Sequence, residues 1–354
     1  MSRESSLLFA LLRATLWSRT VEVELFQGVS SEQWRVVFRL ASQGAVVGLS
    51  FDAIGRLPLE LRPPRPVFMQ WLAVAEQKRE HNRLLREVAQ VVAELYDKAG
   101  VEFVLVKGLG VAELYPDKLM RDGGDLDLLI IKGYDRANEV LLENGAIFTS
   151  NNPKHHSFQF RGVSIENHHQ LSIISPSGKP LTPLYGGSTL SGCQIAIPST
   201  TFNSIYLVEH MAMHFFIYGI GLRHVCDLCC LYSRQGSSID RQAMSEGLKS
   251  IGGTPLLQRL GVVLIDNLGL DPSLLPFVPI RDRMVEPLLR DIIEGGNFGF
   301  YAMTPRTNNR YYNKLLTMRA MVARSWKFRH LGSSFFLKQI RELIVFNFKA
   351  LFGR

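Results

Sequence analysis

Two aspartates separated by one leucine are the sharpest chemical feature of the sequence. Asp125 and Asp127 begin a segment, 125–131, whose other residues are all apolar, as is typical of a buried β-strand. Side chains alternate along a strand, so both carboxylates project from one face while Leu126 and Leu128 point into the core. Two negative charges held so close repel each other unless a cation joins them. The pair therefore predicts a divalent metal site, and the repulsion predicts that replacing either aspartate leaves the metal-free protein at least as stable.

A glycine turn upstream adds to this chemistry. Gly108 follows a mostly apolar run, 102–106, and precedes an expected short helix over 111–115, so its backbone can come close to a phosphate at the start of a helix. Lys107 would add a positive charge to the same phosphates. Mg²⁺ is the expected ion, because it takes oxygen ligands, and two such ions can hold the attacking and leaving oxygens of a phosphoryl displacement. The turn and the two aspartates together predict a metal and triphosphate site.

The same turn has a competing interpretation. Gly108 and Gly110 after a strand form half of a dinucleotide-binding fingerprint. The third glycine position is Glu113, however, and no second βαβ unit follows. A dinucleotide-binding domain would bind NAD without a metal, whereas the site favoured here requires Mg²⁺.

The surrounding periodicity predicts an α+β fold, in which a small mixed β-sheet is flanked by N-terminal and C-terminal helical regions. Apolar residues recur at helical spacing in residues 1–95, including a long predicted helix from 67 to 96 that Pro66 would start. Short strands follow in residues 96–175. Residues 176–200 are rich in Pro, Gly and Ser and are expected to form a linker. Helical spacing returns in residues 201–300, before a basic helical tail over 301–354.

These residues resemble the minimal nucleotidyltransferases of the DNA polymerase β superfamily, most closely its branch of uncharacterised nucleotidyltransferases. The branch has a Lys-Gly turn, an arginine, a Gly-Asp-x-Asp-Leu strand, an acid-x-His strand, and a helical segment with His, Leu-Arg and Asp. The matching positions are Lys107-Gly108, Arg121, Gly124-Asp125-Leu126-Asp127-Leu128, Glu166 with His168, His214, Leu222-Arg223 and Asp227. The resemblance implies a nucleotidyltransferase core over residues 96–175.

The resemblance also implies a role for each site residue. Asp125 and Asp127 would hold two Mg²⁺ ions, and Glu166 would complete one site and orient or deprotonate the acceptor hydroxyl. The NTP would be bound by residues of the turn and of the segment before the strand, namely Lys107, Gly108, Arg121 and Gly124. The superfamily's usual Gly-Ser turn is Lys-Gly here, so Lys107 would replace a hydroxyl by charge.

The implied reaction moves an NMP, by resemblance AMP from ATP, to a hydroxyl of an acceptor. A protein side chain, a sugar or other small molecule, and an RNA end would all demand the same carboxylates. The alternative is a catalytically inactive nucleotidyltransferase fold that serves as a binding or scaffold module. Binding of Mg·NTP without any transfer would favour this alternative.

Several other reactive side chains have simpler interpretations. His210 and His214 have the i, i+4 spacing of a zinc pair, but no third ligand stands at matching spacing, which favours core histidines. The adjacent pairs His155-His156 and His168-His169 place their rings on opposite faces of a strand, a poor geometry for one ion. Arg223 and Asp227, also at i, i+4, are expected to form an ion pair within one helix.

The cysteines and the charge distribution indicate the compartment and the partners. Cys226 and Cys229 lie in a helical pattern without a second pair, so we interpret them as buried thiols in a reducing compartment, and expect a cytoplasmic protein. We find no signal peptide and no transmembrane segment. The net charge is +8, and residues 301–354 carry eleven Lys and Arg against one Glu. A terminal helix over 335–352 is expected to pack on the helical region, with contact to anionic membrane as the sharper alternative and RNA as the third.

Overall fold

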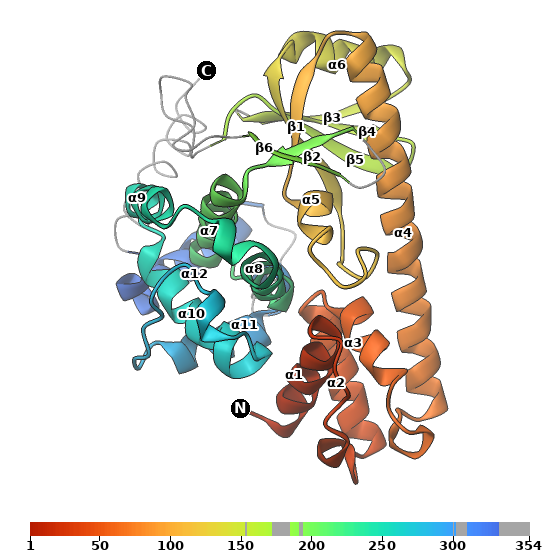
Figure 1. Cartoon of the computed structure of the whole chain (residues 1–354), viewed down its shortest axis with the longest axis vertical. Coiled ribbons are helices and arrows are strands. Elements are labelled where there is room, and N and C mark those ends of the chain that lie inside the picture. Colours follow the sequence, from red (N-terminus) through yellow and green to blue (C-terminus); the bar gives the residue numbers. More distant parts are fainter. Residues whose placement is uncertain (153, 172–184, 191–193, 300, 302–309, 333–354) are drawn as a thin grey trace.

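The structure is a computed structural model that describes residues 1–152, 154–171, 185–190, 194–299, 301 and 310–332. A five-stranded mixed sheet with strand order β1-β2-β5-β4-β3 lies at one end of the molecule (Figure 1). The strands are β1 (Glu102–Val106), β2 (Asp125–Lys132), β3 (Ile147–Asn152), β4 (His155–Phe160) and β5 (Val163–His168). β2 and β5 run parallel, and the other neighbouring strands are antiparallel. Together with the many helices around this sheet, the arrangement confirms the predicted α+β class.

The strand register decides which side chains meet. On β2, Leu126 and Leu128 belong to the apolar core on one side of the sheet, while Asp125 and Asp127 alternate to the other side. The parallel pairing sets Asp127 opposite Glu166 of β5. The sheet therefore has one apolar face and one face that carries carboxylates.

Two helices cover the apolar face. The long helix α4 (Arg65–Lys98) begins with Pro66 in its first turn, where proline lacks only a hydrogen bond that the helix start would not make. Its second half packs on the sheet through Leu85, Val88 and Val92, and α6 (Tyr134–Glu143) shares that core. Its first half extends away from the sheet to the N-terminal helices (Figure 1). One helix thus connects the sheet to the rest of the N-terminal region.

The remaining helices form one body with a common core. These are α1 (Arg3–Leu16), α2 (Ser31–Gln43), α3 (Val47–Ile54), α7 (Thr200–Ile217), α8 (Leu222–Gln235), α9 (Arg241–Ile251), α10 (Thr254–Leu268), α11 (Val285–Gly295) and α12 (Arg310–Lys327). Leu11 of α1, Phe215 of α7 and Leu264 of α10 belong to the same apolar cluster. Trp17, directly after α1, donates a hydrogen bond to the carbonyl of Leu268 at the end of α10, at 2.6 Å. Helices from the N-terminal and C-terminal regions therefore stabilise each other.

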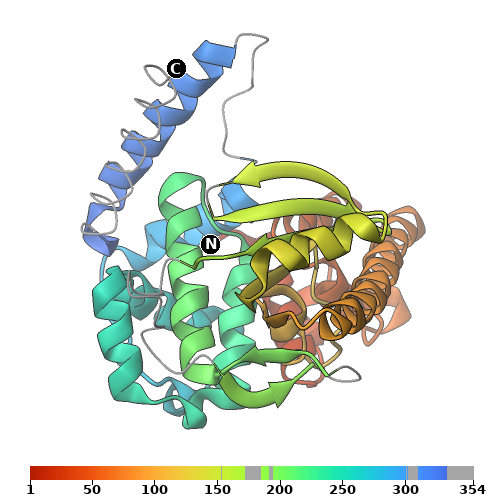
Figure 2. The same ribbon diagram turned by 90° about the horizontal axis from the view of Figure 1, so that it is seen from above.

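Short 3₁₀ segments connect several of these helices. They are Val23–Phe26, Leu59–Leu61, Gly236–Ser238, Pro272–Leu274, Asn297–Gly299 and Arg329–Leu331. α12 packs against α7 at the outer side of the helical body (Figure 2). Trp326, in the last turn of α12, is exposed, whereas Phe328 and Leu331, directly after the helix, are buried in the helical core.

The stretch expected to be a linker, 176–200, contains regular structure in its described part. β6 (Tyr185–Thr189) and β7 (Ala196–Pro198) form a two-stranded antiparallel ribbon. Leu190 and Ile195 are buried in the core of the sheet, and β7 lies against β1. Although the segment is rich in Gly and Ser, its two apolar residues Leu190 and Ile195 attach it to the sheet.

The terminal helix expected over 335–352 lies outside the described residues. Among the helices that are described, none has both the length and the hydropathy that a bilayer-spanning segment requires.

A buried ion pair joins the sheet to the helical body. Arg121, in the loop before β2, donates to Asp227 of α8 through Nε at 2.7 Å and Nη2 at 2.8 Å. The hydroxyl of Tyr115 donates to the same aspartate at 2.6 Å. Asp227 therefore pairs with an arginine from another element, and Arg223, one turn away from Asp227 on α8, donates to the carbonyl of Asp122 at 2.9 Å.

We expect the Arg121→Met variant to lose about 3–5 kcal/mol of unfolding free energy, because Asp227 would keep a buried charge without its ion partner. Urea denaturation followed by circular dichroism measures the change. Arg35→Met, which removes an exposed pair with Glu32, is the matched control and should change stability little. A loss at Arg121 no larger than that of the control would contradict a structural role for this pair.

Candidate active site

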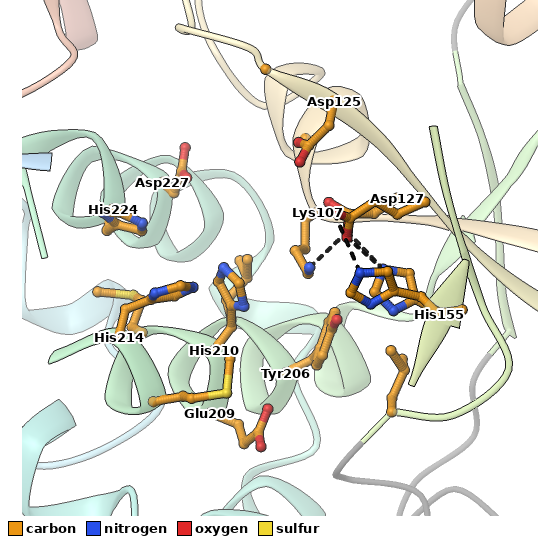
Figure 3. A pocket seen from close by; sticks show the side chains of 18 of the residues that line it. Lys107, Asp125, Asp127, His155, Tyr206, Glu209, His210, His214, His224 and Asp227 are labelled. Carbon is orange, nitrogen blue, oxygen red and sulfur yellow. Dashed lines mark hydrogen bonds and ion pairs between the residues drawn. The ribbon is translucent and has the colours of Figure 1, made fainter. Parts of the chain in front are cut away.

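A cavity of about 440 Å³ lies between the carboxylate face of the sheet and the helices α7 and α8. Figure 3 shows Asp125, Asp127 and His155 on the sheet side, and Tyr206, His210, His214 and His224 on the helix side. The sheet wall is completed by Lys107, Gly108, Arg121, Gly124, Glu166 and His168. All seven residues predicted from the sequence to form the site therefore line this one cavity.

The turn before the cavity is tighter than the sequence predicts. Helix α5 (Gly108–Ala112) begins directly after Lys107, three residues earlier than the expected helix over 111–115. Lys107 reverses the chain by adopting a φ of 56°, a left-handed conformation that is strained for any residue with a side chain. This single strained residue replaces the expected longer turn. It also directs the lysine side chain at the carboxylates.

Three carboxylates meet on the sheet wall. Asp125, Asp127 and Glu166 each offer an oxygen atom, and these atoms all lie within 4.8 Å of one another. Two of the acids come from β2 and the third from the adjacent parallel strand. This is the arrangement that the sequence predicted for the metal ligands.

Asp127 is the buried one of the three carboxylates, and two neighbouring side chains compensate its negative charge. Lys107 Nζ donates to its Oδ1 at 2.8 Å, and His168 Nε2 lies 2.9 Å from the same oxygen. Burial alone would raise the pKa of Asp127, but the charge of Lys107 and the hydrogen bond of His168 prevail and lower it. Asp127 is therefore ionised at neutral pH.

Asp125 has the opposite electrostatic environment. The negative charge of Asp127, followed by burial, raises the pKa of Asp125 to about 6. The two aspartates are thus not equivalent, and we now expect only the replacement of Asp125 to leave the metal-free protein at least as stable. Asp127 has two partners that its replacement would leave uncompensated.

The segment between Arg121 and Asp125 is fixed from behind by α4. The Asn82 side chain donates to the carbonyls of Leu119 at 2.8 Å and Arg121 at 2.7 Å. A Cβ on Gly123 would lie only 2.5 Å from Asn82 Oδ1, so this position accepts no side chain without movement. A Cβ on Gly124 would meet open space at the cavity. Gly123 allows the loop to pack closely against Asn82, and Gly124 faces the space where a ligand would lie.

The histidines on α7 and α8 are neutral. Burial, followed by the charge of Lys107, lowers the pKa of His214 to about 4, and burial lowers the pKa of His210 and His224 as well. His210 and His214 are partly buried and line the cavity, so they are not enclosed in the helical core as the sequence suggested. Cys226, Cys229 and Cys230 are free and buried, as expected. The helix wall combines these imidazoles with the charged side chains of Glu209, Arg223 and Asp227.

Sequence reasoning missed one pairing. The sequence presents His155 and His168 as members of two separate adjacent pairs. In the structure, β4 and β5 set these two histidines directly opposite each other, with ring centroids 4.7 Å apart. Tyr206 is a second omission: its ring lies 5.6 Å from Lys107 Nζ. A hairpin prediction for residues 155–168 with its register would have found the histidine pair.

The cluster of three carboxylates, from Asp125, Asp127 and Glu166, fits a hard divalent ion. Its donors are all oxygen atoms, and the raised pKa of Asp125 shows that the uncompensated negative charge is concentrated there. Lys107 compensates Asp127 from one side only. A cation between Asp125 and Asp127 would remove the remaining repulsion.

The two aspartates should respond differently to pH in the metal-free protein. Since Asp125 titrates at about 6 in the folded state, against 3.8 as its ordinary value, its ionisation costs stability as the pH rises through that interval. Asp125→Asn should therefore melt at a higher temperature than the wild type above about pH 6, and the gain should vanish near pH 4. Asp127→Asn should melt lower than the wild type at neutral pH, because Lys107 and His168 lose their partner. Melting curves in chelator check both, and equal shifts of the same sign would contradict this asymmetry.

Comparison with known proteins gives a family. Residues 30–263 match the family model described as uncharacterised nucleotidyltransferase. No curated protein matches the chain. Among solved structures, the chain is similar to an antigenic nucleotidyltransferase-like protein from Paracoccidioides brasiliensis, with 16% identity, 50% of this chain and 91% of that chain covered, and a TM-score of 0.33, too low for any inference. The family match spans more than half of the chain and confirms the resemblance seen in the motifs, so the chain belongs to the uncharacterised nucleotidyltransferases.

Proposed function

We propose that this protein is a metal-dependent nucleotidyltransferase that moves AMP from ATP to a hydroxyl group of an acceptor. The observation that carries the proposal is the convergence of Asp125, Asp127 and Glu166 on one wall of the cavity. Membership of the nucleotidyltransferase family supports the same reaction class. Acidic residues that merely share a protein surface need neither a parallel strand pair nor a cavity. A site that binds a metal and a nucleotide needs both.

The metal ligands in this proposal are the three carboxylates. Asp125 and Asp127 would hold two Mg²⁺ ions, with Glu166 completing one of the sites. Mg²⁺ supplies positive charge that neutralises the phosphates as negative charge develops on them. Lys107 keeps Asp127 ionised, and therefore ready to bind a cation, through its 2.8 Å contact.

The transfer step is an in-line displacement. The acceptor oxygen forms a bond to the α-phosphorus of ATP, and the bond from that phosphorus to the oxygen bridging to the β-phosphate breaks. Pyrophosphate leaves with the bonding electron pair. The hydroxyl proton passes to the carboxylate of Glu166, which is only partly buried and can reach an incoming group. His168 and His155, next to Glu166, hold that carboxylate in place.

The triphosphate would lie against the Lys107 turn. Lys107 and Gly108 line the cavity next to the aspartates, and Gly124 leaves open space beside them. Helix α5 has only five residues, so we assign the phosphate contact to the ammonium of Lys107 and not to a helix dipole. Arg121 is committed to Asp227, so its proposed effect on the phosphates is that of a nearby positive charge.

The acceptor is a hydroxyl of a protein, of a sugar or other small molecule, or of an RNA end. Three buried free thiols support a reducing compartment, and we propose the cytoplasm. Incubation of the full chain with α-labelled NTPs, Mg²⁺ and a cell extract identifies the acceptor class by the molecule that takes up the label. Binding of Mg·ATP without label transfer to any fraction would favour the inactive binding module instead.

Removal of a proposed metal ligand should abolish transfer in this assay. We expect Asp125→Asn, Asp127→Asn and Glu166→Gln each to lower the rate by more than about 10²-fold, at least the cost of one preorganised electrostatic contact. Asp135→Asn, an exposed acid at the start of α6, is the control and should transfer like the wild type. Because Asp125→Asn is expected to be stable, its inactivity could not be assigned to unfolding. Full activity of that variant would show that the site is misassigned.

The two roles of Lys107 can be separated by substitution. Lys107→Ala and Lys107→Gly both remove the ammonium, so each should weaken ATP binding by about 1.5–3 kcal/mol, as for a charge-assisted contact. Glycine also relieves the left-handed backbone, so Lys107→Gly should be more stable than Lys107→Ala by about 1 kcal/mol. Titration calorimetry and denaturation measure the two effects. Lys132→Ala, an exposed lysine on β2, serves as the control, and unchanged ATP affinity in both variants would move the triphosphate elsewhere.

A further inference from the structure

A second group of metal-binding side chains lies next to the aspartates. His155 Nε2 lies 3.6 Å from Glu166 Oε1, and His168 Nε2 lies 3.3 Å from Glu166 Oε2. One donor atom from each of the three residues falls within 4.8 Å of the other two. The register of β4 and β5 creates this group, because it pairs His155 directly with His168.

The other histidine of each adjacent pair has a different environment. His156 Nδ1 lies 3.1 Å from Asn138 Nδ2, and its ring lies 5.5 Å from that of Tyr134. His169 lies with its ring 5.0 Å from the same tyrosine. The strand pleat therefore divides four histidines into two that pack on Tyr134 and two that face a carboxylate.

We propose that His155, Glu166 and His168 bind a divalent ion of the borderline class, Zn²⁺ by preference, at a second site that shares only Glu166 with the proposed Mg²⁺ ligands. Imidazole nitrogens suit Zn²⁺ and related ions, whereas Mg²⁺ selects oxygen ligands. Two histidines and one carboxylate are also the protein ligands of zinc sites that keep a position open for water or substrate. The donor set thus differs in chemistry from that of the aspartates, which offers oxygen alone.

The two sites share a ligand. Glu166 belongs to both groups, and His168 Nε2 is 2.9 Å from Asp127 Oδ1. An ion held by the histidines would lie at the sheet wall of the same cavity, since His155 and His168 both line it. Occupation of one site should therefore alter the affinity of the other. The inference does not rest on the proposed transfer reaction, because metal binding can be measured without it.

The test uses Co²⁺ as a spectroscopic substitute for Zn²⁺ on the full chain after removal of metals with a chelator. The visible absorption of bound Co²⁺ reports nitrogen ligation, and Zn²⁺ should displace it. His155→Ala and His168→Ala should each weaken Co²⁺ binding by more than about 10-fold, the least that loss of a ligand costs. His156→Ala and His169→Ala are the matched controls and should bind Co²⁺ like the wild type.

Aspartate and glutamate variants separate this site from the magnesium site. Asp125→Asn should keep its Co²⁺ affinity while losing Mg²⁺ affinity, and Glu166→Gln should weaken both. Melting curves verify that each variant is folded, and His155→Ala carries the test if the removal of His168 unfolds the protein. The proposal is overturned if the folded wild type binds no Co²⁺, or if His155→Ala and His168→Ala bind it as tightly as the wild type. Failure of transfer with intact Co²⁺ binding would overturn only the proposed function.

Discussion

The buried negative charge of Asp127 is the constraint around which the site is arranged. A carboxylate removed from water must be paired or it loses its charge. Lys107 and His168 provide that pairing from two different elements, and Lys107 accepts a strained left-handed backbone to do so. The result is an ionised aspartate at a fixed position, beside a second aspartate whose charge is not compensated. Such a pair has unequal affinity for protons.

The cavity depends on a second buried charge pair. Arg121 and Asp227 hold the loop before β2 against α8, so the sheet wall and the helix wall keep their spacing. The same loop is held from behind by Asn82 of α4. The sheet wall presents the three carboxylates beside Lys107, and the helix wall presents imidazoles together with Glu209, Arg223 and Asp227.

The predictable parts of the protein are those set by local spacing. The helical period of residues 67–96 and the position of Pro66 were sufficient to predict α4 closely. The alternation in 125–131 was sufficient to place both aspartates on one face. Glu166 was found by resemblance, and the structure gives the physical reason for its position, which is the parallel pairing of β5 with β2. The family prediction succeeded because the motif consists of short runs, such as Lys107-Gly108 and Gly124–Leu128, that can be read without knowing how the chain folds.

The sequence by itself determined the α+β class, the placement of both aspartates on one face of a strand and the burial of the thiols, because each follows from side-chain periodicity within one element. Only the tertiary structure decided that His155 faces His168, that Arg121 pairs with Asp227, and that Tyr185–Thr189 and Ala196–Pro198 form a ribbon. Each of these depends on a strand register or on the approach of segments that are distant in the chain. Spacing along one strand fixes which face a side chain occupies, but the partner on that face is set by which strand pairs with it and in what register.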